Sequence, residues 1–232
     1  MSGLLWLYPL REKLGDRPGD RDIMRRTFAH WSSIQNKWHG YSFAAASSMS
    51  SVMDAPEEAL RYLKIFLDGT VAADTRRTPD TMYREGANLA IESPITAAQS
   101  IVDILLQGDH GVLKVFPSVS STWRDASFES LRAEGAFLVD ASRRHGATEW
   151  IRVHSEAGEP LTLQHVIAGP IEVRDARGRQ LPWRAEGPGT IRLGRGGTAI
   201  VTRRGARPGL GAPRCARRPG NPGMGNAVTP HR

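Results

Sequence analysis

Two short stretches of the sequence hold aromatic, imidazole and carboxylate side chains close together. The first is Trp38-His39-Gly40-Tyr41, in which two aromatic rings and an imidazole flank a glycine. The second carries Tyr83, Glu85 and Glu92 just before an apolar helix pattern. Aromatic faces stack on sugar rings, and a carboxylate at a loop-to-helix junction can activate water or hold hydroxyl groups. The candidate catalytic residue is Glu92, and the candidate substrate-binding residues are Trp38, His39, Tyr41, Tyr83 and Glu85.

A structural interpretation of the same residues stays open. Trp38 and Tyr41 are equally suited to a hydrophobic core, and Glu85 and Glu92 to a solvated loop or a helix cap. The histidines have no metal-ligand spacing, and Cys215 is the single cysteine. Phosphate-binding, dinucleotide and zinc-protease motifs are absent from the sequence. We therefore expect no metal and no cofactor.

The first half of the chain, up to about residue 110, has helical spacing of its apolar residues. Helix patterns start near Asp20, near Tyr41 and at Asp54-Ala55-Pro56. The last helix opens near Ser93-Pro94, and its apolar stripe runs from Ile95 to Leu106 with an end expected at Gly108. Residues 70–92 form a long connection without clear periodicity, and loops of that length are usually functional.

The second half of the chain has a period of two, which is typical of strands. We predict seven strands, separated by glycine-containing turns, at 112–116, 137–141, 150–155, 161–166, 171–174, 190–193 and 198–201. This spacing indicates a small antiparallel β-sandwich over residues 111–204. Its core is predicted to contain Val115, Phe137, Val139, Ile151, Val153, Leu163 and Val173. The tryptophans at 123, 150 and 183 are assigned to its core in preference to a sugar platform.

The charge of the chain is concentrated at its C-terminus. The 232 residues carry a net charge of +7, yet residues 205–232 hold five arginines and no acidic residue, so the body is close to neutral. This Arg/Gly/Pro-rich tail cannot bury enough apolar surface to fold, and we predict that it is disordered. We expect no nucleic-acid partner. Since no apolar run is long enough to span a membrane or serve as a secretion signal, we expect no membrane partner and take the cytoplasm as the default location.

A longer pattern resembles the end of glycoside hydrolase family 95, which includes α-L-fucosidases. The resemblance rests on residues 88–107, on Gly111 to Pro117, on Trp123 and on the segment 131–137. It extends more loosely from about residue 20 to 204, where His39-Gly40-Tyr41-Ser42 before an alanine-rich helix is similar to the family's Gly-Trp-Ser helix.

The resemblance implies an α+β multidomain chain. Its first part, residues 1–110, would be the last helical hairpins of a partial (α/α)₆ toroid, and its second part the β-sandwich. The family inverts the anomeric centre with one acidic group and one base-side group. The family's base-side aspartate matches Glu92, where a glutamate stands instead, and the family's general acid has no match in this sequence. We therefore expect carbohydrate as the partner and a chain that is inactive by itself. A non-catalytic carbohydrate-binding or structural module is the alternative.

Overall fold

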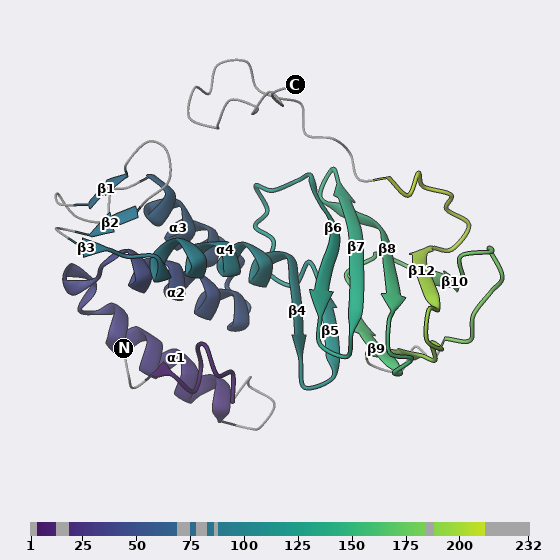
Figure 1. The fold of residues 1–232 in the computed structure, drawn as a ribbon, viewed down its shortest axis with the longest axis horizontal. Helices are drawn as coiled ribbons and strands as arrows, with labels where there is room; N and C mark the ends of the chain where they lie inside the picture. Colours follow the sequence, from purple (N-terminus) through teal and green to yellow (C-terminus); the bar gives the residue numbers. More distant parts are fainter. Residues whose placement is uncertain are drawn as a thin grey trace, which may run out of the picture.

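The protein has an α+β architecture in which helices make up the first half and sheets the second (Figure 1). The computed structural model describes residues 4–12, 19–68, 75–77, 83–85, 88–183 and 188–211, with 75–77, 83–85 and 88 described as backbone only. Within these residues there are four α-helices and two larger, mostly antiparallel sheets. The α+β class predicted from the change of period is therefore confirmed. The described part has no helix that is both long enough and apolar enough to cross a membrane.

The four helices alternate in direction. They are α1 (Asp20–Ser32), α2 (Gly40–Val52), α3 (Pro56–Asp68) and α4 (Glu92–Leu105). Arg21, at the start of α1, forms an ion pair with Asp54, just after the end of α2, so these two helices are antiparallel. The Ser100 hydroxyl of α4 donates to the Ala44 carbonyl oxygen of α2 at 2.7 Å and lies 3.1 Å from the Ser48 hydroxyl. At a second level, the charge of Glu92 at the start of α4 acts on Tyr41 at the start of α2, so these two helices are parallel.

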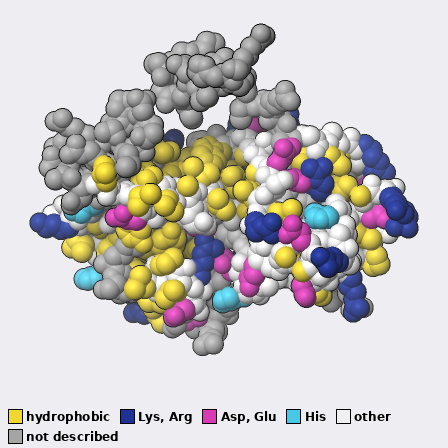
Figure 2. Space-filling view, viewed as in Figure 1, with side chains coloured by type: hydrophobic (Ala, Val, Ile, Leu, Met, Phe, Trp, Pro, Cys, Tyr) yellow, Lys and Arg dark blue, Asp and Glu magenta, His cyan; other side chains and the backbone are white. Residues whose placement is uncertain are grey.

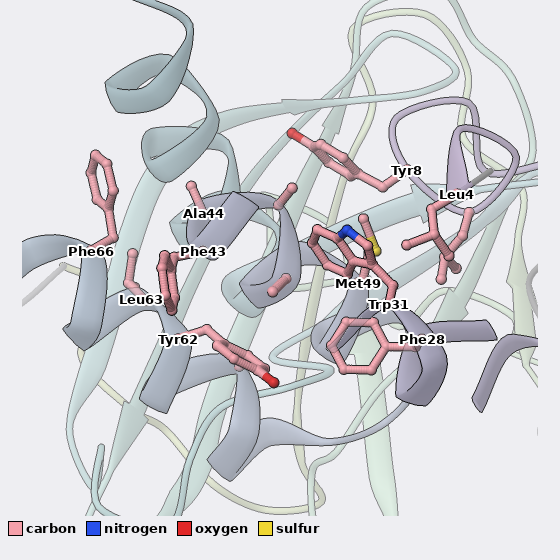
Figure 3. Close-up of a cluster of buried hydrophobic side chains, with 14 of the residues drawn as sticks. Leu4, Tyr8, Phe28, Trp31, Phe43, Ala44, Met49, Tyr62, Leu63 and Phe66 are labelled. Atoms are coloured by element: carbon pink, nitrogen blue, oxygen red, sulfur yellow. The ribbon is translucent and has the colours of Figure 1, made fainter. Parts of the chain in front are cut away.

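Helix α2 lies at the centre of the helical half. Its sequence is rich in alanine and serine, and its residues from Phe43 to Ser51 are all buried. Such small side chains allow neighbouring helices to approach α2 closely. Larger side chains from the other helices, including Phe28, Trp31, Tyr62 and Leu63, complete this core (Figure 3).

Helix α4 turns much of its apolar stripe towards the surface. Ile95 is 60% exposed, and Ile101 is also exposed. The buried face carries Ser93, Thr96, Ala97, Ser100 and Asp103 together with Ile104. The reason lies in α2, because its alanine and serine side chains accept only a face of similarly small residues at close range. As a result, hydrophobic side chains gather on the surface around α4 (Figure 2).

The end of α4 differs from the one predicted from the sequence. The helix ends at Leu105, three residues before the predicted end at Gly108, and the chain continues directly into strand β4 (Leu106–Asp109). Strand β4 pairs with β5 (Val112–Val115), so its backbone is held by a partner distant from the helix. The sheet therefore begins before the boundary predicted at residues 110 and 111.

The two larger sheets contain all seven predicted strands and two more. The five-stranded sheet has the order β10-β12-β8-β7-β6, and the four-stranded sheet the order β11-β9-β5-β4. The remaining bounds are β6 (Ala126–Ala133), β7 (Phe137–Arg144), β8 (Ala147–Ser155), β9 (Leu161–Gln164), β10 (Ile171–Arg174), β11 (Gly189–Ile191) and β12 (Thr198–Arg203). Neighbouring strands are antiparallel except β5 and β9, which are parallel. Strands β4 and β6 are those that the sequence analysis missed.

One apolar cluster joins the two sheets. It includes Val139 and Val153 from the five-stranded sheet and Leu113, Val115 and Leu163 from the four-stranded sheet. All seven residues predicted to form the core of this half belong to the cluster: Val115, Phe137, Val139, Ile151, Val153, Leu163 and Val173.

The described chain continues past β12 as far as Gly211. Arg207, within the segment predicted to be a disordered tail, forms an ion pair with Glu172 of β10 at 2.6 Å. The remainder of that predicted tail, residues 212–232, lies outside the described residues.

Candidate functional site

Glu92 and Tyr41 lie together at one corner of the helical half. Glu92 is the first residue of α4, and Tyr41 is in the first turn of the parallel helix α2. Burial, and then the negative charge of Glu92, raise the pKa of the half-buried Tyr41 phenol. The structure therefore brings together two of the predicted site residues that are about fifty positions apart in the chain.

The same corner is electrostatically suited to an anionic group. The N-terminal ends of α2 and α4 both point there, because the helices are parallel and their first turns are adjacent. A helix N-terminus carries a partial positive charge and unpaired N–H groups, which favour an anion nearby. Glu92 is exposed, and its carboxylate forms no hydrogen bond or ion pair with another described residue. Its carboxylate is consequently available to water or to a ligand.

His39 lies at the same corner, immediately before α2. It occupies the N-cap position, is exposed, and does not hydrogen-bond to the free N–H groups of the helix. An exposed imidazole near a carboxylate and a phenol can accept or donate hydrogen bonds to hydroxyl groups. The position of His39 is therefore compatible with the substrate-binding role that was predicted for it.

Trp38 has a different environment, in the core rather than at the surface. It is 5% exposed, and its ring stacks on Trp31 with centroids 4.0 Å apart. Phe43 packs against it edge-on, and Tyr62 lies beside it. Since neighbouring aromatic rings already cover its surface, this arrangement favours the structural interpretation of Trp38 over that of a sugar-stacking platform.

Tyr83 and Glu85 are placed by their backbone alone. They begin and end strand β2 (Tyr83–Glu85), which lies between β1 (Thr75–Arg77) and β3 (Asn88–Leu89) in a small antiparallel sheet. Glu85 pairs with Asn88, four residues before Glu92. The segment predicted to be an unstructured connection thus contains strands that lead directly into α4, and the side chains of Tyr83 and Glu85 lie outside the described residues.

A buried charged cluster was missed by the sequence analysis. Arg11 forms ion pairs with Asp103 of α4 and with Asp109 of β4, the latter at 2.9 Å, and Gln99 donates to Asp103 at 2.8 Å. Burial, and then the charge of Asp103, raise the pKa of Tyr8 nearby. The one feature of the sequence that indicates this cluster is Asp103, which lies in the otherwise apolar C-terminal end of α4. The cluster connects the N-terminal segment with both halves of the molecule.

The aromatic residues of the β half do not join this corner. Trp150 is completely buried, whereas Trp123 packs against the helical core and not against the sheet core predicted for it. Trp183 packs partly against the core of the sheets. Among the residues that the structure describes, no group of three or more His, Cys, Asp or Glu side chains could hold a metal ion.

Comparison with known proteins adds no further identification. No protein-family model and no curated protein matches this chain. The candidate site therefore rests on the residues and geometry described above.

Proposed function

We propose that the chain is the C-terminal part of an inverting glycoside hydrolase of the α-L-fucosidase type. The observation that carries this proposal is the corner where the charge of Glu92 acts on the Tyr41 phenol, at the common N-terminal end of two parallel helices. The corner combines a free carboxylate, a phenol and an exposed imidazole, which are groups that can bind sugar hydroxyls and orient water.

The helices are proposed to belong to an (α/α)₆ toroid. Support comes from the alternating directions of α1 to α4 and from the parallel packing of α2 and α4, which is the relation expected between inner helices of neighbouring hairpins. Helix α2 is buried over most of its length, whereas α4 leaves Ile91, Ile95 and Ile101 exposed. Contiguous exposed apolar side chains are characteristic of a surface that another element covers. In a complete toroid, the next helical hairpin would cover this exposed apolar surface of α4.

The β half is proposed to be the sandwich that follows the toroid. Its two sheets contribute to one apolar cluster, which is the arrangement of a core enclosed between two layers. The Arg11–Asp103–Asp109 cluster and the direct connection of α4 to β4 would fix this layer to the last inner helix.

Glu92 would act on the water side of the reaction. An inverting glycosidase needs one carboxylic acid for the leaving oxygen and a second group that activates water on the opposite face of the sugar. Glu92 supplies a candidate for the second role alone. We therefore propose that the chain binds its sugar weakly and does not hydrolyse glycosides by itself.

The test is a nuclear magnetic resonance titration with L-fucose, accompanied by an assay of an aryl α-L-fucoside. The signals of Tyr41 and His39 are expected to shift on addition of L-fucose in the native chain and in the control variant Glu58→Gln, which removes an exposed carboxylate from α3. They are expected to remain in place in Glu92→Gln. Equal shifts in Glu92→Gln, or no shift in the native chain, would refute the proposed binding site. Hydrolysis of the aryl fucoside by the native chain but not by Glu92→Gln would refute the proposal that the chain is inactive.

A second candidate function is a carbohydrate-binding or structural module without any catalytic ancestry at Glu92. The burial of Trp38 favours it, because the aromatic platform predicted beside the carboxylate is absent from the surface. This candidate predicts that the chain binds saccharides with the same affinity in the native form and in Glu92→Gln.

A further inference from the structure

A cavity of about 390 Å³ lies along β10, the outermost strand of the five-stranded sheet. It is lined by residues 171–173 of β10, by the segment 180–183 and by Arg204, just after β12. The backbone N–H of Leu181 donates to the Val173 carbonyl oxygen at 2.8 Å, so the segment 180–183 runs beside β10. The backbone N–H of Arg204 donates to the Pro170 carbonyl oxygen at 2.8 Å on the other side of that strand. Three adjacent extended segments thus form the cavity, at the end of the β half away from the helices (Figure 1).

Three polar side chains project to the same side of these segments. Glu172 pairs with Thr202 of β12, and Arg204 lies two residues beyond Thr202. On the other side of β10, Gln180 pairs with Arg174, which lies two residues beyond Glu172. Directly paired residues share a face of a sheet, and so do residues two apart on one strand. Glu172, Gln180 and Arg204 therefore share one face, and all three line the cavity.

Glu172 is held in the cavity as an ionised hydrogen-bond acceptor. Its two carboxylate oxygens accept hydrogen bonds from Arg174 at 3.0 Å and from Arg207 at 2.6 Å. These hydrogen bonds lower the pKa of Glu172 to about 2, so the group is ionised at neutral pH. Each oxygen keeps a further lone pair. Glu172 can consequently accept a hydrogen bond from a ligand hydroxyl group, while its charge is already balanced by the two arginines.

Arg204 and Gln180 supply free polar groups beside this carboxylate. Both residues are exposed, and neither side chain forms a hydrogen bond or ion pair with another described residue. Glu172 is the one acid among the described residues that line the cavity. The positive charge of Arg204 is therefore not compensated within the described lining.

The surface around the cavity is also positive. The described residues from 171 to 211 contain eight arginines and two acidic residues. Dark blue side chains gather at this end of the molecule in Figure 2. A surface with an excess of one charge attracts ligands of the opposite charge. The cavity is thus suited to an anion rather than to a cation.

We propose that this cavity binds a sugar acid, with its carboxylate at Arg204 and its hydroxyl groups at Glu172 and Gln180. A guanidinium group binds a carboxylate through two parallel hydrogen bonds, and a fixed carboxylate and an amide provide the acceptors and donors that hydroxyl groups need. The volume exceeds the lower limit of about 300 Å³ for organic ligands. The site shares no residue with the corner at Glu92, so it does not depend on the proposed glycosidase function. A free sugar acid and the terminal unit of an acidic polysaccharide share this chemistry.

The experiment uses isothermal titration calorimetry of the whole chain at low ionic strength. D-glucuronate carries both the carboxylate and the hydroxyl groups, whereas D-glucose lacks the carboxylate and acetate lacks the hydroxyl groups. We expect D-glucuronate to bind at least about tenfold more tightly than either of the other two, because each of them loses the hydrogen bonds of one part of the site. A hyaluronan tetrasaccharide presents the same acid within a chain. Tighter binding of the tetrasaccharide than of D-glucuronate would identify a polysaccharide as the source of the acid, and weaker binding a free sugar acid.

Matched variants separate the cavity from the general positive charge of this end of the protein. Arg204→Gln is expected to weaken the binding of D-glucuronate by about tenfold, as for the loss of hydrogen bonds to a charged group. Arg177→Gln is the control, since it removes the same charge from an exposed residue of the same end that does not line the cavity. Because Arg204 and Arg177 are exposed, both variants should keep the circular-dichroism spectrum of the native chain. Equal affinity for D-glucose or acetate, equal weakening by Arg177→Gln, or no binding of D-glucuronate would overturn the proposal.

Discussion

Helix α4 offers a direct test of which of its faces is inside. Ile95 and Ile104 are the same residue type in the same helix, but Ile95 is 60% exposed and Ile104 is 1% exposed. Full burial of an isoleucine side chain contributes about 1.5–3 kcal/mol, so the covered fraction of Ile95 contributes about 1 kcal/mol. Truncation of the buried Ile104 loses the whole contribution and leaves a cavity, which costs about 2–5 kcal/mol.

We therefore expect Ile104→Ala to lower the free energy of unfolding by at least about 2 kcal/mol, and Ile95→Ala by no more than about 1 kcal/mol. The change in helix propensity is the same in both variants and cancels in the comparison. The measurement is urea unfolding of each variant, followed by the helical circular-dichroism signal. An equal or larger loss for Ile95→Ala would show that the apolar stripe is packed inside, and would refute the packing of α4 against α2 by its small residues.

Three further predictions concern stability and titration. Trp38→Ala should destabilise the chain by about 3–5 kcal/mol in urea unfolding, because it empties a site between packed aromatic rings, and a loss below 1 kcal/mol would contradict its place in the core. Asp103→Asn should cost about 1.5–3 kcal/mol in the same assay, since Arg11 loses its more deeply buried carboxylate partner but keeps Asp109, and full stability would contradict this role. Hydrogen bonds from Arg174 and Arg207 lower the pKa of Glu172 from 4.5 to about 2, so the stabilisation from this group should be complete above pH 4.5 and lost as the pH falls towards 2. This acid-dependent part should be absent from Glu172→Gln, and identical acid unfolding of both proteins would contradict it.

The corner at Glu92 predicts a change in the titration of Tyr41. In Glu92→Gln the pKa of Tyr41 should fall, because the negative charge that opposes ionisation of the phenol is removed while the effect of burial remains. Nuclear magnetic resonance titration of the Tyr41 ring measures this pKa directly. The same pKa in both proteins would show that the two side chains do not interact.

Local pattern was sufficient for much of the β half. Strand β8 alternates buried and more exposed residues over most of its length, and short turns with glycine lie near its ends, so its period of two is visible without any tertiary information. Strand β6 was missed because a bulge between Phe128 and Leu131 interrupts its register with β7 and the charged residues Glu129 and Arg132 interrupt its apolar pattern. Strand β4 was missed because its leucine continues the apolar stripe of α4.

The sequence by itself thus determined the change from helices to strands, most of the core residues of the sheets and the choice of Glu92 and Tyr41 as candidates. Tertiary structure decided where α4 ends, because β4 exists through its pairing with β5. It also decided which face of α4 is buried, since the small side chains of α2 select small side chains opposite them. The proximity of Glu92 to Tyr41 depends on the parallel packing of two helices that are distant in the chain. Trp38 is buried because the rings of Trp31, Phe43 and Tyr62 pack against it. Apart from the β4–β5 hairpin, these outcomes are contacts between segments that are distant in the chain, whose energies no local periodicity contains.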